Sequence, residues 1–297
     1  MANDLQTAFN SEKWSKRVLT RLDRLNVMLG CGAVNRDYEG EIKAEGDTVW
    51  VRTFGNVTMQ PYARGGSINY EGLTPAKEAL TINDSAYFAF QVDDLDEAQN
   101  DIRALDGYAQ RAAVAMDELI DTKTLSYYAN APTANKVTNS GSAITISASN
   151  AYTSIVAAGL ALDLQSAPKV GRWCIVGPTY KSFLLQDTTY FIRATDMGDR
   201  IIQMGSLSFQ ASSQPGYLGE CAGFHLFLSN AIPGDATGYY NQFGSPGVIS
   251  YAGKIRKVET IRLQNTFATA ARGLILHDGT VFAEHKKAFG YILTSAK

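Results

Sequence analysis

The sequence predicts an α+β fold in which strands from the early and late parts of the chain pair with one another. Residues 41–131 carry the two most informative features, a long strand hairpin over 46–92 and one exceptionally long amphipathic helix directly after it. A two-stranded hairpin is marginally stable alone in water, and a helix of this length outgrows a domain of this size. We therefore expect both elements to complete their structure against other copies of the chain.

The predicted hairpin consists of two strands and a long connection. Residues 46–54 are rich in the β-branched and aromatic residues that strands favour. In 80–92, apolar and polar residues alternate with the period of two that is typical of a half-buried strand. Residues 55–77 contain prolines and glycines, which indicate a loop. Because this connection is long for a compact hairpin, we expect it to project from the body.

The predicted long helix begins at 93 and meets no proline before Pro132. Its first turn is acidic, which suits the positive end of the helix dipole. Such a helix would be about 55 Å long. It could belong to a coiled coil, although the alanines in its apolar stripe fit close packing on a sheet equally well. The predicted stripe consists of Leu95, Ala98, Ile102, Leu105, Ala109, Ala112, Met116 and Leu119.

The rest of the chain is predicted to form a mixed lobe of short helices and strands. One of the predicted helices begins with Pro178. Proline is favourable at the first position of a helix, because its missing N–H would have no partner there anyway. The predicted elements are a short strand at 143–147, a helix at 151–165, a buried strand at 172–176, a helix at 178–186, a strand at 223–228, a helix from 245 to about 256, and a tight hairpin turn at His277-Asp278-Gly279 between strands 274–276 and 281–282.

The first 36 residues are charged and only loosely periodic. Trp14, Val18, Leu22 and Leu25 form a weak helical stripe among basic residues. Two alternatives remain open, a solvated amphipathic helix and an arm that docks on a neighbouring copy, since terminal segments are poorly ordered unless they are tied down.

Composition excludes several classes of protein. The 297 residues carry a formal charge of −2 and 45% hydrophobic residues, which is ordinary globular composition. The near-neutral charge argues against a dedicated nucleic-acid-binding protein. The polar N-terminus predicts no signal peptide, and the lack of any stretch of about 18 apolar residues predicts no membrane span. Expression in a cytoplasm follows.

The three cysteines, Cys31, Cys174 and Cys221, are far apart in the sequence. No C-x-x-C spacing exists, so neither a disulfide framework nor a zinc site is predicted. Cys174 lies in an apolar run, where we expect a buried thiol that behaves as a small hydrophobic group.

The sequence predicts no catalytic residue, no cofactor and no metal. The common phosphate-binding, dinucleotide-binding, hydrolase and metalloprotease motifs are missing. His225 lies in an apolar strand and is predicted to be structural. His277 and His285 stand beside Asp278 and Glu284 in short charged turns, and two histidines with scattered carboxylates are a weak metal signal.

Arg52, Arg64 and Lys77 on the projecting hairpin are the candidates for contacts between subunits. An exposed ion pair is worth only ~0–1 kcal/mol, but an assembly of many copies repeats it many times. Two further basic clusters, 254–257 and 286–287, are either solvated or form ion pairs at the rim of such contacts.

The order of arm, hairpin, long helix and mixed lobe resembles the major capsid protein of tailed double-stranded-DNA bacteriophages. The ordered set of local phrases carries the resemblance, which covers nearly the whole chain, and no single phrase is diagnostic. The phrases are Gly-Asp-Thr-Val-Trp-Val-Arg from 46, Phe-Ala-Phe-Gln-Val-Asp-Asp from 88, Arg-Trp-Cys-Ile-Val-Gly-Pro from 172, Gly-Phe-His-Leu-Phe-Leu-Ser-Asn from 223, and Ala-Arg-Gly-Leu-Ile-Leu-His-Asp-Gly from 271.

The resemblance implies an α+β fold of the Hong Kong 97 type, with an N-terminal arm, an E-loop hairpin, a long spine helix, a peripheral (P) domain and an axial (A) domain. The expected parts are the arm at 1–40, the E-loop and its flanking strands at 41–92, the spine helix and P domain at 93–148, mainly the A domain at 149–265, and the C-terminal P- and A-domain strands at 266–297.

The resemblance also implies a non-enzymatic building block. Its copies would form the pentamers and hexamers of an icosahedral shell that encloses packaged double-stranded DNA, assembled in the host cytoplasm and found in the virion. Implied partners are a separate scaffolding protein, a portal, a decoration protein, and DNA by weak, non-specific contact. The alternative is an encapsulin, the same fold used as a bacterial compartment. A soluble enzyme would instead form small oligomers with a ligand pocket.

Overall fold

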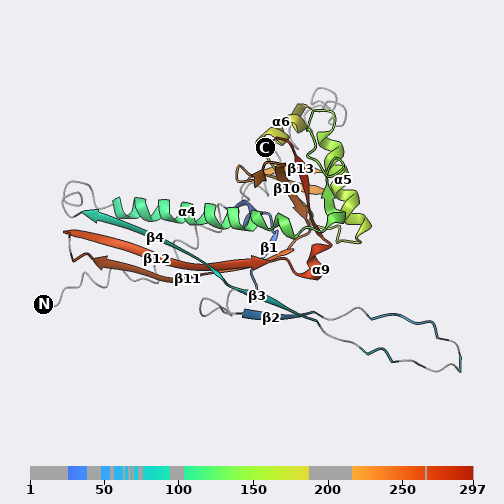
Figure 1. The fold of residues 1–297 in the computed structure, drawn as a ribbon, viewed down its shortest axis with the longest axis horizontal. Coiled ribbons are helices and arrows are strands. Elements are labelled where there is room, and N and C mark those ends of the chain that lie inside the picture. Colours follow the sequence, from blue (N-terminus) through green and yellow to red (C-terminus); the bar gives the residue numbers. More distant parts are fainter. Residues whose placement is uncertain are drawn as a thin grey trace, which may run out of the picture.

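The protein is an elongated molecule with three parts: a long sheet with a helix along it, a mixed lobe, and a hairpin that projects away from both (Figure 1). The computed structural model describes residues 26–38, 48–53, 57–62, 64–65, 68, 70–72, 76–93, 104–186, 216–264 and 266–296.

The long sheet joins strands from opposite ends of the sequence, which confirms the predicted early-to-late pairing. β4 and β12 are antiparallel, with Asp84 opposite His277 and Asp93 opposite Ala268. β12 pairs antiparallel with β11 over most of its length, and β1 runs parallel to β11. In spatial order the strands are β1 (Val34–Asn35), β11 (Ile249–Arg262), β12 (Ala268–Thr280) and β4 (Asp84–Asp93).

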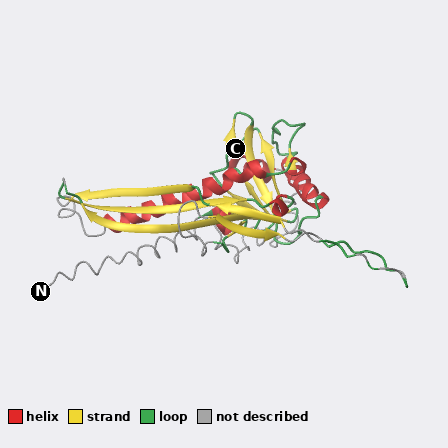
Figure 2. Cartoon of the chain, turned by 60° about the horizontal axis from the view of Figure 1, so that its bottom comes forward, coloured by secondary structure: helices red, strands yellow, loops and turns green. Residues whose placement is uncertain are grey.

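Helix α4 (Ala104–Ser126) lies along this sheet and is the described part of the predicted long helix (Figures 1 and 2). Its 23 residues are about 35 Å long; residues 94–103 of the prediction lie outside the described residues. Met116 and Ile120 pack against Tyr251 and Ile275 of the sheet. The helix therefore uses its apolar stripe on a sheet, which was one of the two predicted alternatives.

The buried stripe of α4 differs from the predicted one. Leu119 is 40% exposed, whereas the polar Asp117, Asp121 and Thr124 are buried. The prediction was right at Met116 and wrong at Leu119, because it followed only apolar residues, and the turns nearest the lobe bury polar side chains that have partners. The Asp121 carboxylate accepts a hydrogen bond from the Met28 N–H at 3.1 Å, and burial raises the Asp121 pKa.

The short helix α2 (Val27–Gly30) is the first described element and packs beside α4. Its N-cap, Asn26, accepts from the Leu29 N–H at 3.0 Å and donates to the Asp117 carbonyl oxygen at 3.3 Å. The predicted stripe from Trp14 to Leu25 lies outside the described residues, so both alternatives for the N-terminal segment stay predictions.

The lobe is built on a second sheet that carries helices on its surface (Figure 2). Its strands are, in spatial order, β5 (Lys136–Val137), β13 (Phe289–Thr294), β10 (Gly238–Gly244), β6 (Trp173–Val176), β8 (Phe224–Leu228) and β7 (Tyr217–Cys221), with β9 (Gly234–Asp235) beside β10. The helices are η3 (Tyr127–Asn130), η4 (Thr133–Asn135), α5 (Ala151–Leu164), α6 (Pro178–Gln186) and α9 (Ala283–Lys286).

Four predicted elements of the lobe are confirmed by α5, β6, α6 and β8, which match within about two residues. Every residue of β6 is buried, and Cys174 is fully buried within it, as expected. Burial raises the pKa of the Cys174 thiol. All three cysteines are free thiols.

Three local predictions were wrong, two of them because strand pairing overrides local signals and one because a predicted strand finds almost no pairing partner. The predicted helix at 245–256 is instead the start of β11, where Tyr251 and Ala252 face opposite sides of the sheet. The predicted turn at 277–279 lies inside β12, which is paired on both sides. The predicted strand at 143–147 is reduced to one bridge between Ile144 and Thr294.

Candidate functional site

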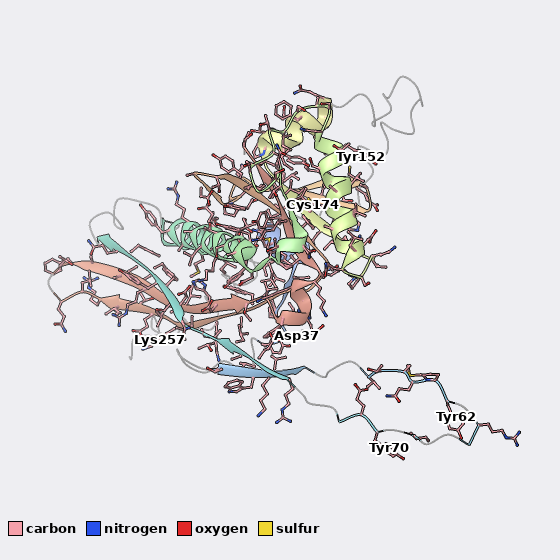
Figure 3. The ribbon with its side chains drawn as sticks, turned by 45° about the vertical axis from the view of Figure 1, so that its right-hand side comes forward. Asp37, Tyr62, Tyr70, Tyr152, Cys174 and Lys257 are labelled. Atoms are coloured by element: carbon pink, nitrogen blue, oxygen red, sulfur yellow. The ribbon has the colours of Figure 1, made fainter. Side chains whose placement is uncertain are left out.

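The projecting hairpin is formed by β2 (Thr48–Thr53) and β3 (Ala76–Thr81), which are antiparallel. The predicted returning strand at 80–92 is in fact divided: β3 pairs with β2, and β4 leaves the hairpin for the long sheet. Figures 1 and 3 show the connection between β2 and β3 reaching far from the rest of the molecule. This confirms the predicted projection.

The inner face of the hairpin holds it to the body. Val49, Leu80 and Ile82 are buried in a cluster with three residues of the body, Ala252, Leu276 and Phe282. On the same side, the carboxylate of Glu78 accepts a hydrogen bond from the Ala283 N–H at 2.8 Å. The base of the hairpin is therefore fixed, and its outer face is left uncovered.

The outer face carries one aromatic side chain and two of the predicted contact residues. Trp50 is 64% exposed, and Arg52 and Lys77 are exposed. Arg52 stands directly opposite Lys77 in the strand register. Like charges in this position repel one another, and within the described part of the chain neither cation has a carboxylate partner. A carboxylate on another molecule would relieve that repulsion.

The far end of the hairpin exposes an unusual number of apolar side chains. They are Val57, Met59, Tyr62, Ile68 and Tyr70, with 66%, 92%, 70%, 66% and 93% of their surface exposed. Figure 3 shows Tyr62 and Tyr70 on this segment, remote from the lobe. Arg64, the third predicted contact residue, is exposed here too, apart from the other two. Clustered exposed apolar residues mark an interaction surface.

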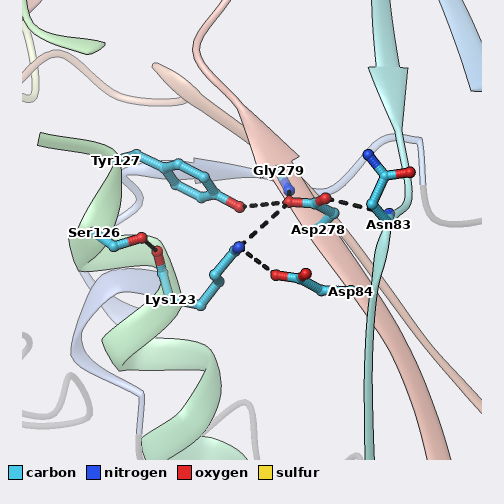
Figure 4. A network of polar contacts seen from close by, with 7 residues as sticks. All are labelled: Asn83, Asp84, Lys123, Ser126, Tyr127, Asp278 and Gly279. Carbon is cyan, nitrogen blue, oxygen red and sulfur yellow. Dashed lines mark hydrogen bonds and ion pairs between the residues drawn. The ribbon is translucent and has the colours of Figure 1, made fainter. Parts of the chain in front are cut away.

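A network of polar contacts fixes the point where the hairpin leaves the body (Figure 4). Lys123 near the end of α4 donates to the Asp84 carboxylate, and its Nζ lies 3.9 Å from Asp278 Oδ1. Asp278 Oδ1 accepts from the Tyr127 hydroxyl at 3.0 Å, and Asp278 Oδ2 accepts from the Asn83 N–H at 3.3 Å. We call these five residues the junction network. It joins the end of α4 and the start of η3 to β12, Asn83 and the first residue of β4.

The environment of the junction network alters its ionisation. The ammonium group of Lys123 holds the pKa of Asp84 below its usual value. Burial, followed by the charge of Asp278, raises the pKa of Tyr127. A Cβ added at Gly279 would lie 3.0 Å from the Tyr127 ring, so glycine permits the close approach of strand and ring. Asp84 is thus an ionised acceptor, and Tyr127 a neutral donor, at neutral pH.

Replacing Lys123 by methionine is expected to lower the free energy of unfolding by about 1.5–3 kcal/mol, because it removes a hydrogen-bonded cation from two carboxylates. The change should also speed hydrogen exchange in peptides around Asn83. Urea unfolding and hydrogen-exchange mass spectrometry would measure these effects. Lys77→Met, an exposed control, should stay within about 0.5 kcal/mol of the wild type; equal effects of both substitutions would contradict this role for Lys123.

The lowered pKa of Asp84 predicts loss of stability in acid. The unfolded chain binds a proton at Asp84 near pH 3.8 and the folded chain only at lower pH, so the stabilising contribution is present above pH 3.8 and disappears as pH falls through the folded pKa. The measurement is the difference in unfolding free energy between wild type and Asp84→Asn, from about pH 6 to about pH 2.5. We expect this difference to become smaller as the pH falls. A difference that stays constant or grows would contradict a stabilising role for ionised Asp84.

The three histidines lie on three separate elements of the described structure. His277 lies buried inside β12, where burial lowers its pKa. His225 is half-buried in β8 with its ring 6.2 Å from Tyr217, and His285 belongs to α9. No group of three or more metal-ligating side chains occurs among the described residues.

None of the described helices is long and apolar enough to span a bilayer.

A family model described as "Phage capsid protein" matches residues 85–290, more than half of the chain. The chain belongs to the phage capsid protein family. The matched region begins within β4, includes α4 and the two longest strands, and covers the lobe as far as the start of β13, so it contains most of the framework from which the hairpin projects. A comparison with curated proteins finds no match.

Solved structures show that this capsid protein has the Hong Kong 97-type fold. It is similar to a protein of Mycobacterium phage Che8 with 22% identity and a TM-score of 0.65, over 88% of this chain and 89% of that one. It is similar to the capsid of Ralstonia phage GP4 with 14% identity and a TM-score of 0.67, over 93% and 90%. It is also similar to a virus-like particle from Pyrococcus furiosus with 13% identity and a TM-score of 0.55, over 95% and 98%.

The sequence predicted the hairpin of this capsid protein but not the junction network at its base. The junction network joins residues up to 195 positions apart, and the local sequence predicts a turn at Asp278. One signal was available: Asp278 follows the apolar run Leu274–Leu276 and precedes Val281, and a carboxylate within a buried strand requires a partner.

Proposed function

We propose that this shell-forming phage coat protein assembles into the pentamers and hexamers of an icosahedral capsid around packaged double-stranded DNA, with the hairpin of each copy lying over an adjacent copy. The observation that carries the proposal is the hairpin itself. Its inner face is anchored, while its outer face and far end expose apolar side chains with no cover from the described body of their own chain.

The charges of the hairpin support the same contact. Arg52 and Lys77 form a pair of adjacent cations beside the exposed ring of Trp50. An acceptor surface with one or two carboxylates and an apolar patch would match them. We propose that Arg52, Lys77 and Arg64 make ion pairs with the neighbouring copy, each of small energy and repeated over the whole shell.

The proposal keeps the expected division of the chain. The E-loop occupies 41–92, the spine helix and P domain 93–148, mainly the A domain 149–265, and the C-terminal strands 266–297, with the arm at 1–40. The lobe would cluster around the capsomer axes. The chain would act as a building block without enzymatic activity, assembled in the host cytoplasm with a separate scaffolding protein, a portal and a decoration protein. Contact with DNA would be weak and independent of sequence, as suits a formal charge of −2.

Negative-stain electron microscopy of the expressed chain, with and without its scaffold, tests this function. We expect closed shells, or rings of five and six subunits. A chain that stays monomeric or dimeric under every assembly condition would contradict it.

An encapsulin-type compartment is the second candidate, because one of the similar structures is described as a virus-like particle and not as a phage capsid. The contents of purified particles separate the two: packaged DNA or attached tails indicate a virus, and enclosed protein cargo in small shells indicates a compartment.

A further inference from the structure

Helix α5 is apolar on both of its sides. Its inner side places Ile155, Ala158 and Leu162, all fully buried, against the lobe core. A surface helix normally turns a polar face to solvent, and a helix that is apolar all round is normally covered all round. The described part of the chain covers only one side of α5.

The uncovered side of α5 consists of Val156, Leu160 and Leu164, and Val170 in the following loop is also exposed. Their exposed fractions are 45%, 59%, 75% and 85%. The three helical residues are spaced four apart, so they lie on one face. We call these four residues the α5 outer face. Figure 3 shows α5, with Tyr152 near one end, at the surface of the lobe.

The four side chains of the α5 outer face are all apolar, and the charged residues next to them in sequence are Asp163 and Lys169. Asp163 is the one charged residue of the helix, and its carboxylate is held by the guanidinium of Arg172 at 2.7 Å. This ion pair holds the pKa of Asp163 below its usual value. What covers the face must therefore be largely apolar.

We infer that the α5 outer face is covered by a second copy of this chain. This rests on the proposed function and says which surface of the lobe meets a neighbour. Four apolar side chains expose at most a few hundred Å², well below the about 800 Å² per partner of a standard stable complex. A separate partner would need more surface. A copy within a shell does not, because several contacts hold it at once.

The test uses Leu160→Cys as a reporter of burial. In unassembled subunits this thiol should react readily with a maleimide reagent. The native thiols give little background, because Cys174 and Cys221 are buried and burial raises the pKa of Cys31 to about 12. In particles whose only polypeptide is this chain, we expect the reaction to be about tenfold slower or more. Val156→Cys serves as a second reporter if the first variant does not fold, and particles dissociated into subunits should recover full reactivity.

The outcomes separate the inference from the proposed function. Shells in which the reporter reacts as fast as in free subunits would overturn the inference alone. Protection that begins only when scaffolding or decoration protein is added would also overturn it, since another partner would then cover the face. A wild-type chain that never assembles would overturn the proposed function and this inference with it.

Discussion

Replacing Met59, Tyr62 and Tyr70 by serine is expected to prevent shell assembly while leaving the subunit as stable as the wild type. The three side chains are 92%, 70% and 93% exposed, so the folded subunit gains little from them. Exposed positions of this kind usually change the free energy of unfolding by no more than about 0.5 kcal/mol. Their effect should appear only where a neighbouring copy buries them.

The expected size of this effect follows from apolar burial. Fully burying one large apolar side chain contributes about 1.5–3 kcal/mol, and the triple variant removes three of these from every copy. Even partial burial makes each residue worth roughly a factor of ten in an association constant. We therefore expect few or no shells at subunit concentrations where the wild type assembles completely.

A conservative triple variant is the control for this experiment. Met59→Leu with Tyr62→Phe and Tyr70→Phe keeps apolar groups of similar size at the same positions and should assemble. Electron microscopy and sedimentation would count shells, and urea unfolding would report subunit stability. Normal assembly of the serine variant would contradict a role for the far end of the hairpin in the contact.

Replacing Trp173 by alanine is expected to have the opposite pattern, a loss of folding rather than of association. Trp173 is fully buried in β6, its Nε1–H donates to the Ser245 carbonyl oxygen at 2.8 Å, and its ring lies 6.2 Å from that of Phe289. Its removal creates a large cavity, for which losses of about 3–5 kcal/mol are typical. It also takes a hydrogen bond from a buried carbonyl. The total free energy of unfolding of most single domains is only about 5–15 kcal/mol.

Trp50→Ala is the matched control, because it removes the same side chain from an exposed position. Trp50 is 64% exposed on the hairpin, so its loss should leave the urea midpoint of the subunit nearly unchanged and weaken assembly. Similar destabilisation by the two substitutions would contradict the described burial of these tryptophans.

The sequence predicted elements well where local pattern and tertiary environment agree. The four-residue run of β6 and the proline that begins α6 are examples, since burial and local geometry favour the same state. It failed where pairing partners far along the chain decide the structure. The segment after Pro246 carries a helix-start signal, but β12 lies alongside it and makes it a strand. His277-Asp278-Gly279 has turn composition, but all three residues pair with β11, and His277 also pairs with Asp84 of β4.

In the candidate site, too, the sequence predicted what local pattern decides and missed what distant residues decide. The projection of the hairpin followed from its composition, and Arg52, Lys77 and Arg64 were correctly placed on it. The register that sets Arg52 opposite Lys77 depends on where β3 ends, which alternation alone did not reveal. The role of Lys123 depends on Asp84 and Asp278, which lie 39 and 155 positions away in the sequence. No local sequence pattern indicates that Lys123, Asp84 and Asp278 lie close together in the fold.

The central claim is that the hairpin of one copy completes its structure on another copy. A reconstruction of assembled particles by cryo-electron microscopy tests it most directly. The predicted result is density for the segment between β2 and β3 lying over an adjacent subunit, with Tyr62 and Tyr70 covered by that subunit. Density that follows the hairpin back onto its own lobe, or into solvent in every copy, would contradict the claim.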